Sequence, residues 1–160
     1  MDDQKLQQAI SLLLEALGED PTRAELAHTP TRVAELFRDL YRGVGIDPAS
    51  VLEPSSALVD DNDHVGDLVW LRGIQFSSIC EHHLLPFRGT ADVAYQPRER
   101  LVGLGVLAEL VSVAAARPQM QERLGDMVAD ALVRSGVATG SLVVIRAEHG
   151  CVQHRGPRLH

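Results

Sequence analysis

The chain has 160 residues, which suits one globular domain with a modest core. Hydrophobic residues make up 45% and charged residues 23%, an ordinary composition for a folded protein. The net charge of −7, from 15 Lys and Arg against 22 Asp and Glu, argues against broad binding to nucleic acids or anionic membranes.

The sequence offers no sign of membrane insertion or export. No apolar run approaches the roughly 20 residues that span a bilayer. The N-terminus, Met1-Asp2-Asp3-Gln4, lacks the basic start of a secretory signal. We therefore expect a cytoplasmic protein whose cysteines are free thiols or metal ligands rather than a disulfide.

The first 66 residues predict two helices and a long connection. Residues 3–17 carry apolar residues at helical spacing and end before Gly18. Thr29-Pro30 is typical of an N-cap followed by a proline in the first turn, and the apolar stripe after it ends at Gly43. Residues 44–66 contain two prolines and an acidic run, and we interpret them as a connection.

The remaining residues alternate between strand and helix patterns. We expect strands near 68–79 and 89–95, helices near 106–116 and 119–134, and a buried strand at 142–145. This order predicts an α+β fold in which two helices pack on an antiparallel sheet, preceded by N-terminal helices. The predicted regions are an N-terminal helical region (1–43), a connecting segment (44–66) and a catalytic domain (67–160).

Two clusters of metal-ligand residues lie at predicted strand ends. Cys80-Glu81-His82-His83 follows the first strand, and His149-Gly150-Cys151 follows the last. Cys80, Cys151 and one histidine would give zinc three protein ligands and leave one position open for water, as in catalytic zinc sites. Spacing does not decide whether His82 or His83 is the ligand, and a reactive cysteine or plain core packing remains the alternative. The neighbouring histidines can move protons near neutral pH.

A third unusual segment runs from Arg117 to Arg123. Gln121 and Glu122 stand at the start of a predicted helix, where a carboxylate is favourable through the helix dipole alone. A carboxylate can also accept two N–H bonds from the edge of guanine, with a glutamine completing the pattern. Without further context, the helix-capping interpretation is favoured.

Taken together, these segments resemble the GTP cyclohydrolase I family. The resemblance covers Thr29–Ala34, Phe76–His83, Tyr95–Pro97, Val102–Leu104, Arg117–Leu124 and Glu148–Gly156, in that order. It implies the family's T-fold, assembly into a homo-oligomer with active sites between subunits, and a zinc cofactor. Family enzymes hydrolyse C8 of GTP, open the imidazole ring, expel formate and recyclise the product to dihydroneopterin triphosphate.

The resemblance also assigns roles by position. It implies that Cys80, His83 and Cys151 bind zinc, and that His82 and His149 handle protons. Gln121 and Glu122 match residues that hold the guanine edge. Arg32 and Arg155 match residues that contact phosphates.

The predicted phosphate side departs from the family pattern. Gly105-Val106 stands where the family has Ser-Lys, and Glu109 stands where it has Arg. The chain also stops at His160, where the family continues into another strand. Our leading hypothesis is a zinc cyclohydrolase that hydrolyses C8 of a guanine-type ring on a substrate with fewer phosphates than GTP. The alternatives are an ordinary GTP cyclohydrolase I and a non-catalytic purine- or pterin-binding protein.

Overall fold

The computed structural model describes residues 1–52, the backbone of 56–58, and residues 67–154. The chain divides into two compact units, Met1–Arg42 and Gly43–His160, each of which is described by itself. Part of the predicted connection, residues 53–55 and 59–66, lies outside the described residues. The last six positions, including Arg155, lie outside them too.

The smaller unit contains the two predicted N-terminal helices, α1 (Asp3–Ala16) and α2 (Thr29–Leu40). The Asp2 side chain caps α1 by accepting from the Lys5 N–H, and Gly18 follows it with a φ of +86°. Arg38 on α2 forms an ion pair with Asp3 on α1. Thr29 was expected to be the N-cap, but it is the first helical residue. The helix begins there because the Arg32 N–H already bonds to the His28 carbonyl.

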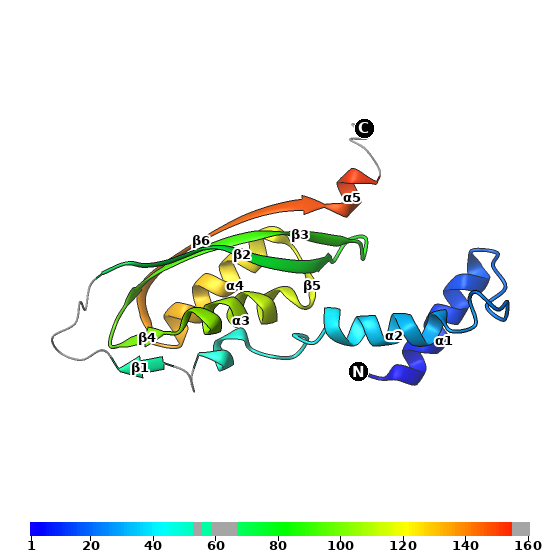
Figure 1. Ribbon diagram of the computed structural model, residues 1–160, viewed down its shortest axis with the longest axis horizontal. Helices are drawn as coiled ribbons and strands as arrows, with labels where there is room; N and C mark the ends of the chain where they lie inside the picture. Colours follow the sequence, from blue (N-terminus) through cyan, green and yellow to red (C-terminus); the bar gives the residue numbers. More distant parts are fainter. Residues whose placement is uncertain (53–55, 59–66, 155–160) are drawn as a thin grey trace. The chain divides into compact units, whose positions relative to one another are not determined.

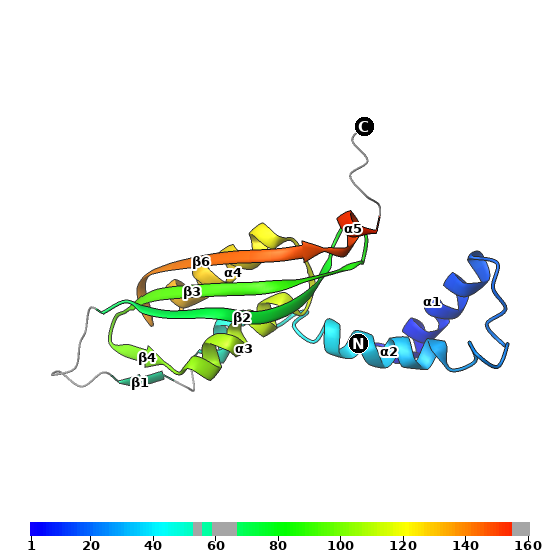
Figure 2. The same cartoon turned by 45° about the horizontal axis from the view of Figure 1, so that its top comes forward.

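The larger unit is a sheet with helices on one face. Three long strands, β2 (Val69–Cys80), β3 (Pro86–Pro97) and β6 (Ala138–His149), pair antiparallel with β3 between the other two. The helices α3 (Leu104–Ala115) and α4 (Gln121–Arg134) lie side by side against the sheet, as Figures 1 and 2 show. The α+β prediction, consistent with a T-fold, is therefore confirmed.

Several shorter elements were not predicted. The two-residue strand β5 (Pro118–Gln119) pairs parallel with the end of β2, so the four-stranded sheet is mixed. A 3₁₀ turn, η1 (Pro48–Val51), and the strand β1 (Ser56–Leu58) lie within the segment interpreted as a connection. β1 pairs with β4 (Arg100–Val102), and the one-turn helix α5 (Gly150–Gln153) follows β6.

The predicted strand at 142–145 is only the middle of β6. The strand extends to His149, because it pairs with β3 along its whole length. Its outer residues Arg146 and Glu148 are exposed and polar, so they did not continue the apolar run by which the strand was recognised.

The core lies between the sheet and the two helices. Alternate residues of β3, among them Ala91, Val93 and Tyr95, face this core and are almost completely buried. From the helices come Leu107, Leu110, Leu124, Val128 and Leu132, all fully buried. The buried Tyr95 hydroxyl accepts the Val102 N–H at 2.8 Å and so joins β4 to the sheet.

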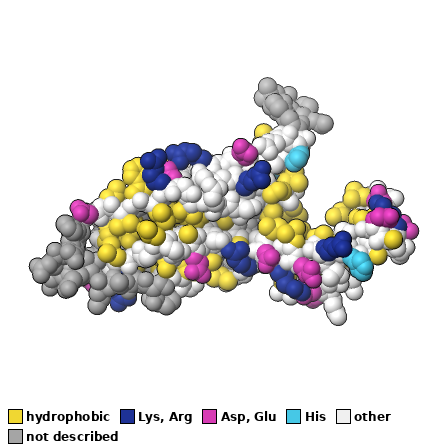
Figure 3. Space-filling view, viewed as in Figure 1, with side chains coloured by type: hydrophobic (Ala, Val, Ile, Leu, Met, Phe, Trp, Pro, Cys, Tyr) yellow, Lys and Arg dark blue, Asp and Glu magenta, His cyan; other side chains and the backbone are white. Residues whose placement is uncertain are grey.

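The surface of the larger unit is partly apolar. Figure 3 shows hydrophobic side chains over much of the visible face, and the exposed ones include Trp70, Leu104 and Leu142. Among the described residues, no helix combines the length and the hydrophobicity needed to cross a membrane.

A bulge in β2 is stabilised by a buried carboxylate on β3. The pairing register shifts between Leu71 and Ile74, and Gly73 in the bulge has a φ of +73°, which favours glycine. Its N–H donates to Asp92 at 2.8 Å, and Arg146 on β6 donates to the same carboxylate at 2.8 Å. Asp92 therefore joins the three long strands on the face opposite the core.

We expect Asp92→Ala to lower the urea midpoint of unfolding more than Asp92→Asn, because Asn keeps an acceptor for the Gly73 N–H. The Arg146 hydrogen bond, followed by that of Gly73, lowers the pKa of Asp92 below its usual value. An acid whose folded-state pKa is lowered contributes stability above the unfolded-state pKa and loses it as pH falls through the folded-state pKa.

The stability difference between the wild type and Asp92→Asn should therefore shrink as the pH is lowered from about 7. Asp126→Asn, at an exposed position on α4, is the matched control and should change little at any pH. If the stability difference between the wild type and Asp92→Asn stayed the same in acid, the negative charge of Asp92 would contribute nothing to the stability of the fold.

Candidate metal centre and active site

The first half of the predicted site is a tight turn between β2 and β3. Cys80 ends β2, and Pro86 begins β3. The Cys80 N–H donates to the Leu85 carbonyl at 2.8 Å, and the Leu84 N–H donates to the Cys80 carbonyl at 2.9 Å. Leu84 has a φ of +53°, a left-handed conformation that lets the chain reverse here. The turn presents His82 and His83 at the surface beside the buried Cys80.

The second half is brought to this turn by the pairing of β6 with β3. The register places His149 opposite Phe87, so β6 ends where β3 begins. Helix α5 then starts at Gly150, where a Cβ atom would lie 2.7 Å from the Pro86 carbonyl oxygen. Only glycine permits this close approach, and the next residue is Cys151.

These two halves bring Cys80, His83 and Cys151 together. One ligand atom from each lies within 4.8 Å of the others, although Cys151 is far from the first two in sequence. Donor atoms that share a tetrahedral zinc at about 2.0–2.3 Å lie roughly 3.3–3.8 Å apart, so small movements suffice to close the set. Two cysteines and one histidine are also a donor set that zinc prefers. The residues present therefore fit a zinc ion.

The two cysteines are close enough to influence each other. Both are free thiols in the structure. Burial, followed by the neighbouring Cys80 sulfur, raises the pKa of the Cys151 thiol above its usual value. A dication at the centre of the cluster would reverse this effect, because it stabilises the thiolate forms that bind metal.

His82 and His149 both lie beside the cluster. His82 Nδ1 is 3.9 Å from the Cys80 sulfur, and the His82 side chain is 61% exposed. His149 precedes Cys151 by two residues, and its ring stacks on the buried ring of Phe87 at 5.0 Å. The two predicted proton-handling residues therefore come one from each half of the site, His82 from the turn after β2 and His149 from the end of β6.

An ion pair connects the metal turn to helix α4. Arg123, in the first turns of α4, donates two hydrogen bonds to the Glu81 carboxylate, at 2.5 and 3.1 Å. This hydrogen bonding lowers the pKa of Glu81 below its usual value. The residue between Cys80 and His82 is thereby tied to the helix that carries Gln121 and Glu122.

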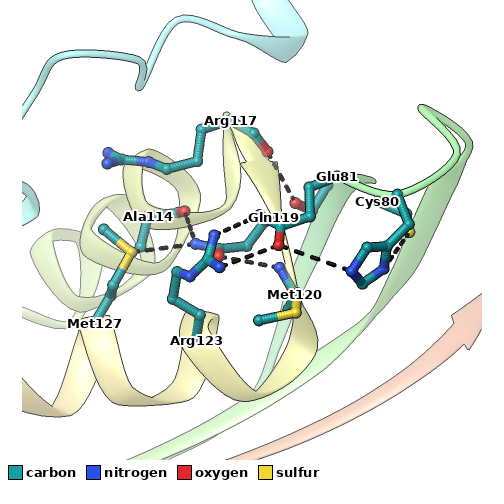
Figure 4. A network of polar contacts seen from close by, with 10 residues as sticks. Cys80, Glu81, Ala114, Arg117, Gln119, Met120, Arg123 and Met127 are labelled. Carbon is teal, nitrogen blue, oxygen red and sulfur yellow. Dashed lines mark hydrogen bonds and ion pairs between the residues drawn. The ribbon is translucent and has the colours of Figure 1, made fainter.

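A buried amide supports the same junction from behind. Gln119 is completely buried, and its Nε2 donates to the Ala114 carbonyl at 3.1 Å and contacts the Met127 sulfur at 3.2 Å. Its Oε1 accepts the Met120 N–H at 3.1 Å, and its backbone carbonyl accepts the Glu81 N–H at 3.1 Å. Figure 4 shows these contacts around the start of α4. Sequence analysis singled out this segment but gave Gln119 no role, since a buried amide network leaves no periodic pattern.

The other predicted site residues lie in different places. Gln121 is the first residue of α4, and its amide bonds to His149 at 2.9 Å. Glu122 follows it and is exposed in the first helical turn. Arg32 is exposed on α2 of the smaller unit, and Arg155 lies outside the described residues. The structure thus brings together the metal ligands, both histidines and the start of α4.

Comparison with known proteins decides the family. A profile of the GTP cyclohydrolase I family matches residues 6–160. GTP cyclohydrolase 1 of Finegoldia magna is 45% identical over 98% of this chain and 82% of its own length. The protein of the same name from Leifsonia xyli is 45% identical over 98% of this chain and 81% of its own. GTP cyclohydrolase 1 of Streptococcus pneumoniae is 44% identical over 99% of this chain and 83% of its own length. The chain belongs to the GTP cyclohydrolase I family.

Membership of the GTP cyclohydrolase I family makes the chain a zinc-dependent hydrolase that acts on a cyclic amidine C–N bond. The Cys80–His83–Cys151 cluster is where the described part of the chain could hold the metal. The comparisons also favour an ordinary GTP cyclohydrolase I over our leading hypothesis of a substrate with fewer phosphates, because the relatives carry that name along nearly the whole chain.

We expect about one zinc ion per chain in the purified wild type and loss of most of this zinc in His83→Ala. Inductively coupled plasma mass spectrometry after gel filtration measures the zinc content. His83 is exposed, so its removal should leave the fold intact. Cys80→Ser and Cys151→Ser should also lose zinc, with circular dichroism to check folding.

His82→Ala is the matched control and should keep its zinc, because it changes the neighbouring exposed histidine of the same turn. If His83→Ala kept its zinc and His82→Ala lost it, His82 rather than His83 would be the zinc ligand.

Proposed function

We propose that this chain hydrolyses C8 of GTP, releases it as formate and forms 7,8-dihydroneopterin triphosphate. The observation that carries the proposal is the cluster of Cys80, His83 and Cys151, with His82 in contact with the Cys80 sulfur and His149 two residues before Cys151. It occurs in a chain about 45% identical to proteins named GTP cyclohydrolase 1. A protein that only bound purines would need neither His82 nor His149.

In this proposal, Cys80, His83 and Cys151 hold the zinc. When bound, zinc supplies Lewis-acid activation of water for attack on C8. His82 and His149 transfer protons to and from the ring nitrogens as the imidazole ring opens.

Substrate recognition uses other residues. The Glu122 carboxylate at the start of α4 accepts N–H bonds from the amidine edge of guanine. The resemblance implied the same role for Gln121, whose amide is bonded to His149 and to the Ile145 carbonyl. Arg32 and Arg155 contact the phosphates, since a guanidinium binds phosphate oxygens in pairs. The exposure of Glu122 and Arg32 supports these roles, because both side chains are accessible to a ligand.

The same proposal extends to organisation. Residues 67–160 form the catalytic T-fold domain, with residues 1–43 as a helical region and 44–66 as the connecting segment. We propose a homo-oligomer with active sites between subunits. The exposed side chains of Trp70, Leu104 and Leu142 support association, because apolar surface of this kind is typical of interfaces.

Wild-type protein loaded with zinc should release formate from GTP and yield a product that fluoresces after oxidation. His82→Ala and His149→Ala should each lower kcat by a factor on the order of 10²–10⁴, the usual contribution of general acid–base catalysis. Zinc content should be unchanged in both variants.

His154→Ala is the control, because His154 is exposed at the end of α5 and has no proposed role. Activity should remain at the wild-type level in this variant. Wild-type protein that binds zinc but releases no formate from any guanine derivative would support the non-catalytic alternative.

A second candidate function is hydrolysis of a guanine compound with fewer phosphates. Helix α3 begins at Leu104, and Gly105 in its first turn offers no side chain to a ligand. Glu109 is exposed one turn later on the same helix. Relative to the family pattern, Val106 in place of Lys removes one positive charge, and Glu109 in place of Arg makes the charge more negative by two units. The net charge at these positions is therefore three units more negative. After screening, such a change could lower triphosphate affinity by roughly a thousandfold.

The decisive comparison is steady-state turnover of GTP, GMP and guanosine. We expect GTP to be preferred, and a preference for GMP or guanosine would establish the second candidate. Glu109→Arg should lower the KM for GTP by about tenfold while leaving that for guanosine unchanged, because only GTP carries phosphate charge.

Asp130→Arg makes the same charge change at an exposed position on α4 and controls for the net charge. Equal effects of Glu109→Arg and Asp130→Arg would show that position 109 does not face the phosphates.

A further inference from the structure

Gln121 makes two hydrogen bonds that together determine how its amide is oriented. Its Nε2 donates to the Ile145 carbonyl at 2.9 Å, and its Oε1 lies 2.9 Å from His149 Nε2. Both partners belong to β6, an outer strand of the described sheet. Helix α4 packs against β6, which brings the Gln121 amide within reach of both partners.

The Ile145 bond decides which end of the amide faces His149. A backbone carbonyl only accepts, so the NH₂ end of Gln121 must point to Ile145. The amide oxygen therefore points to His149, and it also only accepts. His149 Nε2 must then donate the hydrogen of this bond, so the Nε2 edge of the ring is the one that faces Gln121.

The ring of His149 is also held by a flat contact. The Phe87 ring lies parallel to it, with an interplanar angle of 4° and a centroid distance of 5.0 Å. Phe87 is 1% exposed and lies opposite His149 in the β3–β6 register, so this contact is fixed by the core. Stacking defines the plane of the His149 ring, and the Gln121 bond defines its rotation within that plane.

We propose that Gln121 is a positioning residue for His149, rather than a direct contact to guanine. It orients the ring by holding its Nε2 edge toward α4. Glu122, whose side chain is exposed one residue further along α4, is left to recognise the guanine edge. The inference rests on the proposed function, because it requires His149 to transfer a proton during turnover.

The test separates kcat from KM. Gln121→Met keeps the length of the side chain but removes both hydrogen bonds. We expect kcat with GTP to fall by about 10- to 100-fold while KM changes by less than about threefold, the pattern of an interaction that acts on the transition state. Gln121→Glu keeps an acceptor for His149 Nε2–H and should recover a kcat well above that of Gln121→Met. Zinc content and thermal unfolding should stay near wild-type values in both.

Glu122→Ala is the matched variant on the same turn and should mainly raise KM for GTP. A higher KM for Gln121→Met with kcat unchanged would overturn the inference and make Gln121 a guanine contact. So would equal kcat values in Gln121→Met and Gln121→Glu. Wild-type protein that does not turn over GTP would instead refute the proposed function, so the two failures are distinguishable.

Discussion

The antiparallel pairing of β3 with β6 is the constraint on which the site depends. It sets Phe87 opposite His149, and the chain that follows delivers Cys151 to the turn after Cys80. A slip of one residue would turn His149 to the other face of the sheet. Gly89 allows the strands to approach closely, since a Cβ there would lie 1.8 Å from the Arg146 carbonyl oxygen. The metal cluster is thus a consequence of strand register.

Helix α4 completes the site because polar contacts tie its first turns to both halves of the cluster. The Arg123–Glu81 ion pair fixes it to the metal turn, and the Gln121–His149 bond fixes it to the end of β6. Behind them, the buried amide of Gln119 holds the short segment between α3 and α4. Reactive groups supported in this way need little rearrangement when substrate binds, which favours catalysis.

The hydrolytic and phosphate sides of the site obey different physical rules. Zinc ligation demands particular donor atoms at short distances, and Cys80, His83 and Cys151 offer such atoms within 4.8 Å of one another. Phosphate binding sums Coulomb interactions that depend weakly on direction, so positive groups can supply it from several places. In the proposed function, Val106 and Glu109 in place of basic residues are therefore compatible with the family's reaction, whereas a change among the proposed zinc ligands is not.

Much of the fold followed from local patterns. Apolar spacing in residues 3–17 predicted a helix, and β-branched residues at 142–145 predicted a strand, because such patterns reflect the burial of one face. The strand was expected to be buried, but Leu142 is 59% exposed and residues 143–145 are only partly buried. A zinc site that includes Cys80, His83 and Cys151 could likewise be predicted from the sequence, since few residue types bind zinc. The short strands β1, β4 and β5 were missed because pairing with distant residues, rather than propensity, forms them.

By itself, the sequence determined the fold class, the metal-binding residue types and the family. Only the tertiary structure decided that these residues meet, that Asp92 stabilises the bulge at Gly73, and that the Gln121 amide is bonded to His149. The physical reason is that hydrogen-bond geometry between residues far apart in the chain depends on strand register and helix packing. Neither leaves a local signal in the order of amino acids.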